Sequence, residues 1–320
     1  MLTASELKTL LRTHGLRLTK RLGQHHLVDA SMIQRIVQAC ELTMQETVVE
    51  LGAGLGALTE PLAARAASVI AVEIDRRVCE HLSLRLAHQP RVSVVCADLL
   101  HLPWTQAEPE EPPGQSRGTS QPTLHGGRHP APPTDLSRAP SREAGASGGV
   151  VVVGAIPYHI TSPILVRLCE QRQFIQRAIL VIQREIAQRL CATPGTKAYG
   201  RLSVFGQYGW RMTPLFTVPR RAFFPQPEVD SACVRFVPHA TAPIRVVEEP
   251  FFFEVVKAAF AHRRKTLLNC LSDFEYPGRL SPPQIRQLLQ VLGVPAGVRG
   301  EQLSLAQFGV LADRLARAKK

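Results

Sequence analysis

Short apolar runs alternate with amphipathic stretches of helical period along the first part of the chain. The apolar runs predict buried strands at 48–51, 68–75, 91–100, 149–153 and 178–183. The periodicity of the other stretches predicts helices at 5–13, about 30–40, 57–65, 77–87 and 162–170. A further helix is predicted to follow the strand at 178–183 and to end at Arg189. Nearly continuous apolar strands that alternate with helices are typical of a parallel sheet covered on both faces. The pattern therefore predicts a doubly wound α/β domain.

The pattern changes in the last third of the chain. Two further β-rich pieces are predicted at 202–210 and 229–237, so the α/β domain should end near residue 240. Helical periods follow at 251–261, 283–292 and 305–318, with Gly293 as a helix end and Ser304 as a helix cap. We expect residues 1–240 to form the α/β domain and residues 241–320 a small helical domain.

Residues 104–149 interrupt the α/β pattern. Eight of the 25 prolines and seven of the 22 glycines fall here, among Ser, Thr, Gln, Glu and Arg. Such a segment has almost nothing to bury, so it predicts disorder or a long surface loop. Because it lies between two strands of one domain, it is interpreted as an insertion rather than a linker.

A glycine-rich turn follows the first predicted strand. Gly52, Gly54 and Gly56 alternate with Ala and Leu, and a helical stretch comes directly after them. This is how a nucleotide-binding α/β domain usually begins, because glycine permits positive φ and lets a ligand approach the backbone. Glycine-rich turns without a ligand are also common, and the G-x-G-x-G spacing differs from the dinucleotide pattern.

Two carboxylates are predicted at the ends of the next strands. Glu73 lies about 20 residues beyond the glycines, where an acid can reach a ribose, and Asp98 ends the third strand. Each could instead be a strand-end carboxylate that caps a helix. Since ligands of open α/β sheets bind at the carboxyl ends of the strands, we expect both acids and the glycine turn to share one crevice. An acid at the third strand favours S-adenosylmethionine over a nicotinamide cofactor.

The amino-acid composition indicates what kind of partner the protein binds. The formal net charge of +12 predicts a polyanionic partner, most simply a nucleic acid, although a solvated basic surface is the alternative. Arg263, Arg264 and Lys265 form a basic cluster after a predicted helix; they could bind phosphate or simply form a solvated face. The adjacent His25 and His26 lack a third ligand nearby, so no metal is expected.

Seven scattered cysteines without a C-x-x-C motif predict reduced thiols rather than a zinc site or a disulfide framework. No apolar run approaches the roughly 18 residues of a membrane span. We therefore expect a cytoplasmic protein that does not bind membranes and that acts as a monomer.

Several stretches together resemble the ribosomal RNA small-subunit adenine N6,N6-dimethyltransferases. The matching pieces cover the chain outside the insertion: residues 21–29, 50–60, 72–75, Asp98, 154–163, 197–204, 223–231 and 260–269. The resemblance implies a Rossmann-like S-adenosylmethionine domain with a small helical domain. It also implies dimethylation of two adjacent adenines in the 3′-terminal hairpin of 16S rRNA, within the small ribosomal subunit or its precursor. Helical residues 241–320 would then bind RNA.

The resemblance also assigns site residues. The cofactor would be held by His25, Leu27, Gly52, Glu73, Asp98 and the residue at position 155, here Ala155. The backbone carbonyl of Ile156 would accept a hydrogen from the target amino group. Tyr158 would stack on the flipped adenine, helped by Phe223 or Phe224.

This chain departs from the family at two positions. His26 stands where the family has an aromatic residue, and Ala155 stands where the family has Asn. The Asn oxygen would be one of two acceptors that aim the amino lone pair at the methyl group. Losing one such bond costs about 1.5–3 kcal/mol, or about 10- to 100-fold in rate.

The departure at Ala155 therefore predicts a slow methyltransferase. The alternative is an assembly factor that binds S-adenosylmethionine and rRNA but methylates poorly or not at all. A nicotinamide-dependent oxidoreductase is disfavoured by the glycine spacing and by Asp98. The Erm-type enzymes that methylate 23S rRNA are a closer alternative, against which the helical C-terminus and residues 197–204 argue.

Overall fold

A mixed sheet forms the centre of the molecule. The computed structural model describes residues 4–13, 25–101, 149–295 and 297–318. Among these residues, seven strands form one sheet in the order β4-β3-β2-β5-β6-β9-β7, and β1 and β8 form a separate antiparallel pair. The first five strands are parallel, whereas β9 runs antiparallel to both β6 and β7. The predicted insertion at 104–149 lies outside the described residues except for Gly149.

The strands are β1 (His26–Leu27), β2 (Thr47–Leu51), β3 (Ser68–Glu73), β4 (Val92–Cys96), β5 (Val150–Ala155), β6 (Ile175–Gln183), β7 (Trp210–Val218), β8 (Phe223–Phe224) and β9 (Ser231–Pro238). The helices are α1 (Ala4–Thr13), α2 (Ala30–Ala39), α3 (Thr59–Ala63), α4 (Arg76–Arg85), α5 (Thr161–Glu170), α6 (Arg184–Leu190), α7 (Arg201–Gly209), α8 (Glu249–Ala259), α9 (Leu267–Ser272), α10 (Pro282–Val291) and α11 (Leu305–Arg317).

Successive residues of the parallel strands enter two different hydrophobic clusters. Val48 and Val151 pack with α2 and α3 on one face, whereas Val49 and Val152 pack with α5 and α6 on the other. This alternation follows from the period of two along a strand. Because both faces are covered, the strands are apolar throughout, which is why their sequence shows runs rather than alternation. The expected α/β fold is confirmed.

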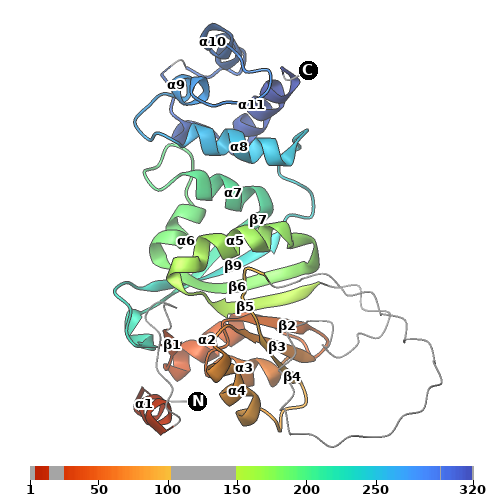
Figure 1. The fold of residues 1–320 in the computed structure, drawn as a ribbon, viewed down its shortest axis with the longest axis vertical. Coiled ribbons are helices and arrows are strands. Elements are labelled where there is room, and N and C mark those ends of the chain that lie inside the picture. Colours follow the sequence, from red (N-terminus) through yellow and green to blue (C-terminus); the bar gives the residue numbers. More distant parts are fainter. Residues whose placement is uncertain (1–3, 14–24, 102–148, 296, 319–320) are drawn as a thin grey trace, which may run out of the picture.

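A second core lies in the helical part of the chain. Figure 1 shows α8–α11 at the end of the molecule that is opposite α1, with α7 between them and the sheet. Val204 and Tyr208 of α7 pack in the same cluster as Phe252 of α8 and Phe308 of α11. This cluster crosses the boundary predicted at residue 240, so the two parts are joined by a shared apolar contact.

Two sequence predictions about this region are wrong. Residues 201–209 form helix α7, where a β-rich piece at 202–210 was expected, and α9 was not foreseen. Helix α7 is covered from two sides: Leu202 packs against the sheet cluster, while Tyr208 packs against α8. A helix buried on both sides lacks the one-sided period that distinguishes it from a strand.

Helix α5 begins slightly earlier than expected. A 3₁₀ turn at Tyr158–Ile160 runs directly into the helix at Thr161, so Ser162 is not the cap. The Thr161 hydroxyl instead donates to the Pro157 carbonyl at 3.2 Å. Pro163 still fits because it lies in the first helical turn, where the N–H groups have no partner within the helix.

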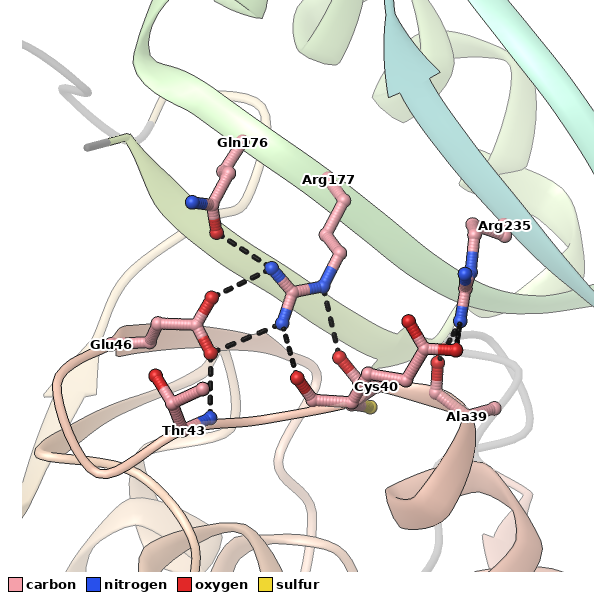
Figure 2. A network of polar contacts seen from close by, with 8 residues as sticks. Ala39, Cys40, Thr43, Glu46, Gln176, Arg177 and Arg235 are labelled. Carbon is pink, nitrogen blue, oxygen red and sulfur yellow. Dashed lines mark hydrogen bonds and ion pairs between the residues drawn. The ribbon is translucent and has the colours of Figure 1, made fainter.

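The end of α2 is tied to the sheet by a polar network (Figure 2). The Arg177 guanidinium of β6 donates to the Cys40 and Glu41 carbonyls, both at 2.9 Å, and to the Glu46 carboxylate at 2.7 and 3.1 Å. With a further bond to Gln176, all five of its N–H donors are used. Arg235 of β9 donates to the Ala39 carbonyl at 2.9 Å. The network fixes α2, which continues the segment that carries His25.

Candidate active site

A cleft opens at the carboxyl ends of β2, β3 and β5. About 970 Å³ of space lies between its walls and at its open mouth, so the cleft is a solvent-filled hollow rather than a closed cavity. Its lining comes from the β1 region, the glycine turn, the ends of β3 and β5, the segment after β4, and residues of β6, β8 and β9: His25, His26, Gly52, Gly54, Glu73, Ile74, Asp98, Leu99, Leu100, Ala155, Ile156, Pro157, Tyr158, His159, Ile160, Val181, Phe223 and Ser231. The cleft lies where the strand order reverses between β2 and β5, the place where open α/β sheets bind ligands.

The glycine turn has the backbone that its sequence requires. Gly52, Gly54 and Gly56 have φ of 73°, 53° and 79°. Residues other than glycine rarely adopt these values. A Cβ atom at Gly54 would lie 2.8 Å from Nδ1 of His26, and one at Gly56 would lie 2.7 Å from Leu82. The turn therefore needs glycine for conformation and for space.

Glu73 is a buried carboxylate held by the backbone. Its oxygens accept from the N–H groups of Gly54 at 2.9 Å and of Ile74 and Asp75 at 3.0 Å. Burial raises the pKa of Glu73, and these three bonds counteract the rise. A carboxylate has about four acceptor positions, so about one remains for a ligand hydroxyl.

Asp98 follows β4 at the other side of the cleft. One of its oxygens accepts from the Leu100 N–H at 2.9 Å, and the other lies 3.1 Å from Nδ1 of His101. Its side chain is 39% exposed, so it can still meet a ligand donor. The structure thus brings the predicted residues Gly52, Glu73 and Asp98 into one cleft.

The segment after β5 forms the wall on which the target base was expected. Ala155 and Ile156 line the cleft, and the Ile156 N–H bonds to the Val181 carbonyl at 3.0 Å. Tyr158 is fixed by a hydrogen bond of 2.9 Å between its hydroxyl and that of Ser231. Ser231 is fully buried, and its contact with Tyr158 spans 73 residues of sequence. No local sequence signal identifies Ser231 as the partner that orients this ring.

The two histidines before α2 have different environments. Nδ1 of His25 lies 2.6 Å from the Pro225 carbonyl, and the His25 ring contacts the Tyr158 ring with centroids 5.7 Å apart. His26 packs against Gly54; burial, and less strongly the neighbouring His25, lower the pKa of His26 to about 4. His26 is therefore neutral at physiological pH. Leu27 is 5% exposed and packs in the core, outside the lining of this cleft.

The two phenylalanines of β8 face different sides. Phe223 lines the cleft, although its side chain is only 6% exposed and packs in the same core cluster as Leu27. Phe224 packs beside α1, where Lys8 lies 5.1 Å from its ring centroid. Phe224 is therefore not part of the lining of this cleft.

The basic cluster lies in the helical part of the chain. Arg263, Arg264 and Lys265 are exposed in the turn between α8 and α9. Arg263 donates to the Lys197 carbonyl and lies 3.6 Å from Glu301, and Lys265 lies 3.1 Å from Asp273. Such exposed ion pairs contribute little stability and can exchange for phosphate.

The described residues contain no group of three or more His, Cys, Asp or Glu side chains that could hold a metal ion. None of the helices in this part of the chain is both long enough and apolar enough to cross a membrane.

The fold and the cleft together define a Rossmann-like methyltransferase of the S-adenosylmethionine class. The chain belongs to the ribosomal RNA adenine dimethylase family, whose sequence profile matches residues 15–315. It is 34% identical over 313 residues to a ribosomal RNA small subunit methyltransferase A of Geobacillus sp. (strain WCH70), covering 98% of this chain and 97% of the relative. The protein of the same name from Geobacillus kaustophilus is 35% identical over 314 residues, covering 98% and 96%.

Solved structures agree with this assignment. A dimethyladenosine transferase from Plasmodium falciparum has a TM-score of 0.68 and 21% identity, covering 92% of this chain and 98% of that one. The 23S rRNA methyltransferase ErmE has a TM-score of 0.58 and 28% identity, covering 91% and 99%. These findings confirm the expected family, the α/β fold with helical C-terminal part, the enzyme class of rRNA adenine dimethylase, and S-adenosylmethionine as its cofactor.

Proposed function

We propose that this protein dimethylates the N6 amino groups of two adjacent adenines in the 3′-terminal hairpin of 16S rRNA. The cleft supports this proposal because it brings together the carboxylates Glu73 and Asp98 and the aromatic ring of Tyr158 in the turn after β5. The curated relatives that cover 98% of the chain at 34–35% identity are named for the small subunit, which favours it over 23S rRNA. We further propose a cytoplasmic monomer that acts on the small ribosomal subunit or its precursor.

The family resemblance suggests the roles of the cofactor residues, and their places in the cleft support it. S-adenosylmethionine supplies the methyl group as an electrophilic carbon bound to sulfur. Glu73 would accept from a ribose hydroxyl, Asp98 from the adenine amino group of the cofactor, and Gly52 would leave room for its methionine end. His25 and Ala155 line the same space. Leu27 would contribute through the backbone, since its side chain lies in the core.

The target base would be held by the turn after β5. Tyr158 would stack on the flipped adenine, with Phe223 on the other side, and its bond to Ser231 fixes the ring before the base arrives. The Ile156 carbonyl would accept one N–H of the target amino group, which aims the nitrogen lone pair at the methyl carbon. Arg263, Arg264 and Lys265 would contact the RNA backbone at a distance from the cleft.

The direct test is methylation of undermethylated small ribosomal subunits with labelled S-adenosylmethionine, followed by mass spectrometry of the hairpin. We expect two dimethyladenosines in the hairpin and no label in 23S rRNA. Ala155 favours one alternative, an assembly factor that binds small subunits without methylating them. Tight binding of the particle with no dimethyladenosine would establish that alternative and refute the enzyme.

A further inference from the structure

His25 is held in one tautomer by a contact across the fold. Its Nδ1 lies 2.6 Å from the Pro225 carbonyl, 200 residues away in sequence. A carbonyl oxygen only accepts, so Nδ1 must carry the hydrogen. In the neutral ring the lone pair is then on Nε2, at the edge of the ring that is not bound to Pro225. His25 therefore presents a hydrogen-bond acceptor.

The acceptor lies beside the expected base platform. The ring centroids of His25 and Tyr158 are 5.7 Å apart with an interplanar angle of 31°, and both side chains line the cleft together with Ala155. An adenine placed on Tyr158 would lie beside this imidazole. Ala155, which replaces the family Asn, and His25 line the same cleft.

Other polar side chains of the cleft are less suited to this task. Glu73 accepts three backbone N–H groups, and the proposed function uses the free acceptor positions of Glu73 and Asp98 for the cofactor. The Ser231 hydroxyl is bonded to Tyr158.

The two other histidines that line the cleft are also less suited. His26 packs against Gly54 of the glycine turn, on the side of the cleft proposed for the cofactor. His159 is exposed, and no bond within the described residues fixes its ring.

We propose that Nε2 of His25 accepts an N–H of the target adenine and so supplies the acceptor that Ala155 lacks. The proposal rests on the proposed function. The N6 lone pair forms the bond to the methyl carbon while the carbon–sulfur bond breaks and its electron pair stays on sulfur. The nitrogen then carries one extra proton, which passes to Nε2 and from the imidazolium to water. With Ile156 as the second acceptor, the pair of acceptors is complete.

A double-mutant cycle tests the proposal. The single-turnover rate is measured with saturating S-adenosylmethionine and small subunits for the wild type, His25→Phe, Ala155→Asn and the double variant. We expect His25→Phe to slow methyl transfer about 10- to 100-fold in the wild type, and at most about threefold in the Ala155→Asn background. Ala155→Asn alone should gain only a few-fold. An equal loss in both backgrounds, or no loss in either, would show that His25 does not accept from the target base and would overturn the proposal.

His159→Phe is the matched control, because it also removes an imidazole from the cleft. Its effect should be the same in both backgrounds. If the effect of His159→Phe, and not that of His25→Phe, depends on residue 155, then His159 is the acceptor and the proposal is overturned.

A binding measurement is independent of turnover. Hairpins with adenine or with unsubstituted purine at the target position are titrated in the presence of S-adenosylhomocysteine, which fills the cofactor site without reaction. The wild type should prefer adenine about 2- to 10-fold, the range of one hydrogen bond. His25→Phe should lower this preference, because only the Ile156 carbonyl then accepts from the amino group, and adding Ala155→Asn to His25→Phe should restore it. A preference unchanged by His25→Phe would overturn the proposal even in an inactive enzyme, whereas absent methylation with an intact preference would refute only the proposed function.

Discussion

Glu50 beneath the glycine turn offers a quantitative test of the site's electrostatics. Its side chain in β2 is 1% exposed, and its carboxyl accepts the Thr59 hydroxyl at 2.6 Å. Burial raises the pKa of Glu50 from its ordinary value of 4.5 to about 8; the Thr59 bond lowers it and the charge of Glu73 raises it further. We therefore expect Glu50 to be neutral in the folded protein at pH 7. The substitution Glu50→Gln keeps a neutral side chain of nearly the same size and shape.

The size of the effect follows from linkage. Below pH 4.5 the carboxyl is protonated in both states and costs nothing, so its stabilising contribution is fully present there. Between pH 4.5 and about 8, the unfolded chain releases the proton that the folded protein keeps. The free energy of unfolding then falls by about 1.4 kcal/mol per pH unit, or about 5 kcal/mol over the whole interval. Glu50→Gln removes this dependence because an amide does not titrate.

The assay is urea unfolding of the wild type and Glu50→Gln between about pH 4.5 and 8.5. The two stabilities should nearly coincide at the acid end and diverge with rising pH, with the variant several kcal/mol more stable above about pH 8. Glu80→Gln is the control, because its exposed carboxylate pairs with Arg76 on the surface and should shift stability by less than about 1 kcal/mol. Parallel curves for Glu50→Gln and the wild type would refute the reasoning and show that Glu50 is ionised in the folded state.

Three further substitutions test other contacts. Arg177→Met should lower the free energy of unfolding in urea by about 3–5 kcal/mol, because it strands a half-buried carboxylate; combination with Glu46→Gln should cost less than the two single effects together. Tyr158→Phe keeps the ring but removes the hydroxyl that bonds to β9, so methyl transfer should slow about 2- to 10-fold with unchanged S-adenosylmethionine affinity by calorimetry. Gly154→Ala would place a Cβ 2.6 Å from a backbone oxygen of β2 and should cost about 1–3 kcal/mol in thermal unfolding. At Gly200, where nothing lies within 4 Å, the same change should be nearly neutral.

The sequence predicted the cofactor side of the cleft because its signals are local. The alternating glycines, Glu73 and Asp98 each follow a strand, and parallel strands end at one edge of a sheet. The cap of α2 at Asp29 is equally local, since its carboxylate accepts from the N–H groups of the first helical turn at 2.9 and 3.1 Å. Such features depend on residues that are neighbours in the chain.

The base side of the cleft could be predicted only in part. The aromatic turn was found by resemblance, but nothing near Tyr158 in sequence indicates Ser231, and nothing near Phe223 and Phe224 indicates which of them faces the cleft. That choice depends on the pairing of β1 with β8, two strands nearly 200 residues apart. Helix α7 was predicted wrongly for a similar reason, because its burial from two sides is a property of the folded molecule.

The substitution at Ala155 shows how the two kinds of information combine. From the sequence alone, losing the Asn oxygen predicts a slower enzyme, because one of two acceptors is missing. The structure adds a histidine acceptor whose tautomer is set by the Pro225 carbonyl, a contact that no sequence motif reveals. If His25 compensates, then a residue at the rim of the cofactor site also aligns the target nitrogen. The two sites would then be coupled through one imidazole, so that weak cofactor binding and slow methyl transfer should appear together in His25 variants and separately in variants of Glu73 or Tyr158.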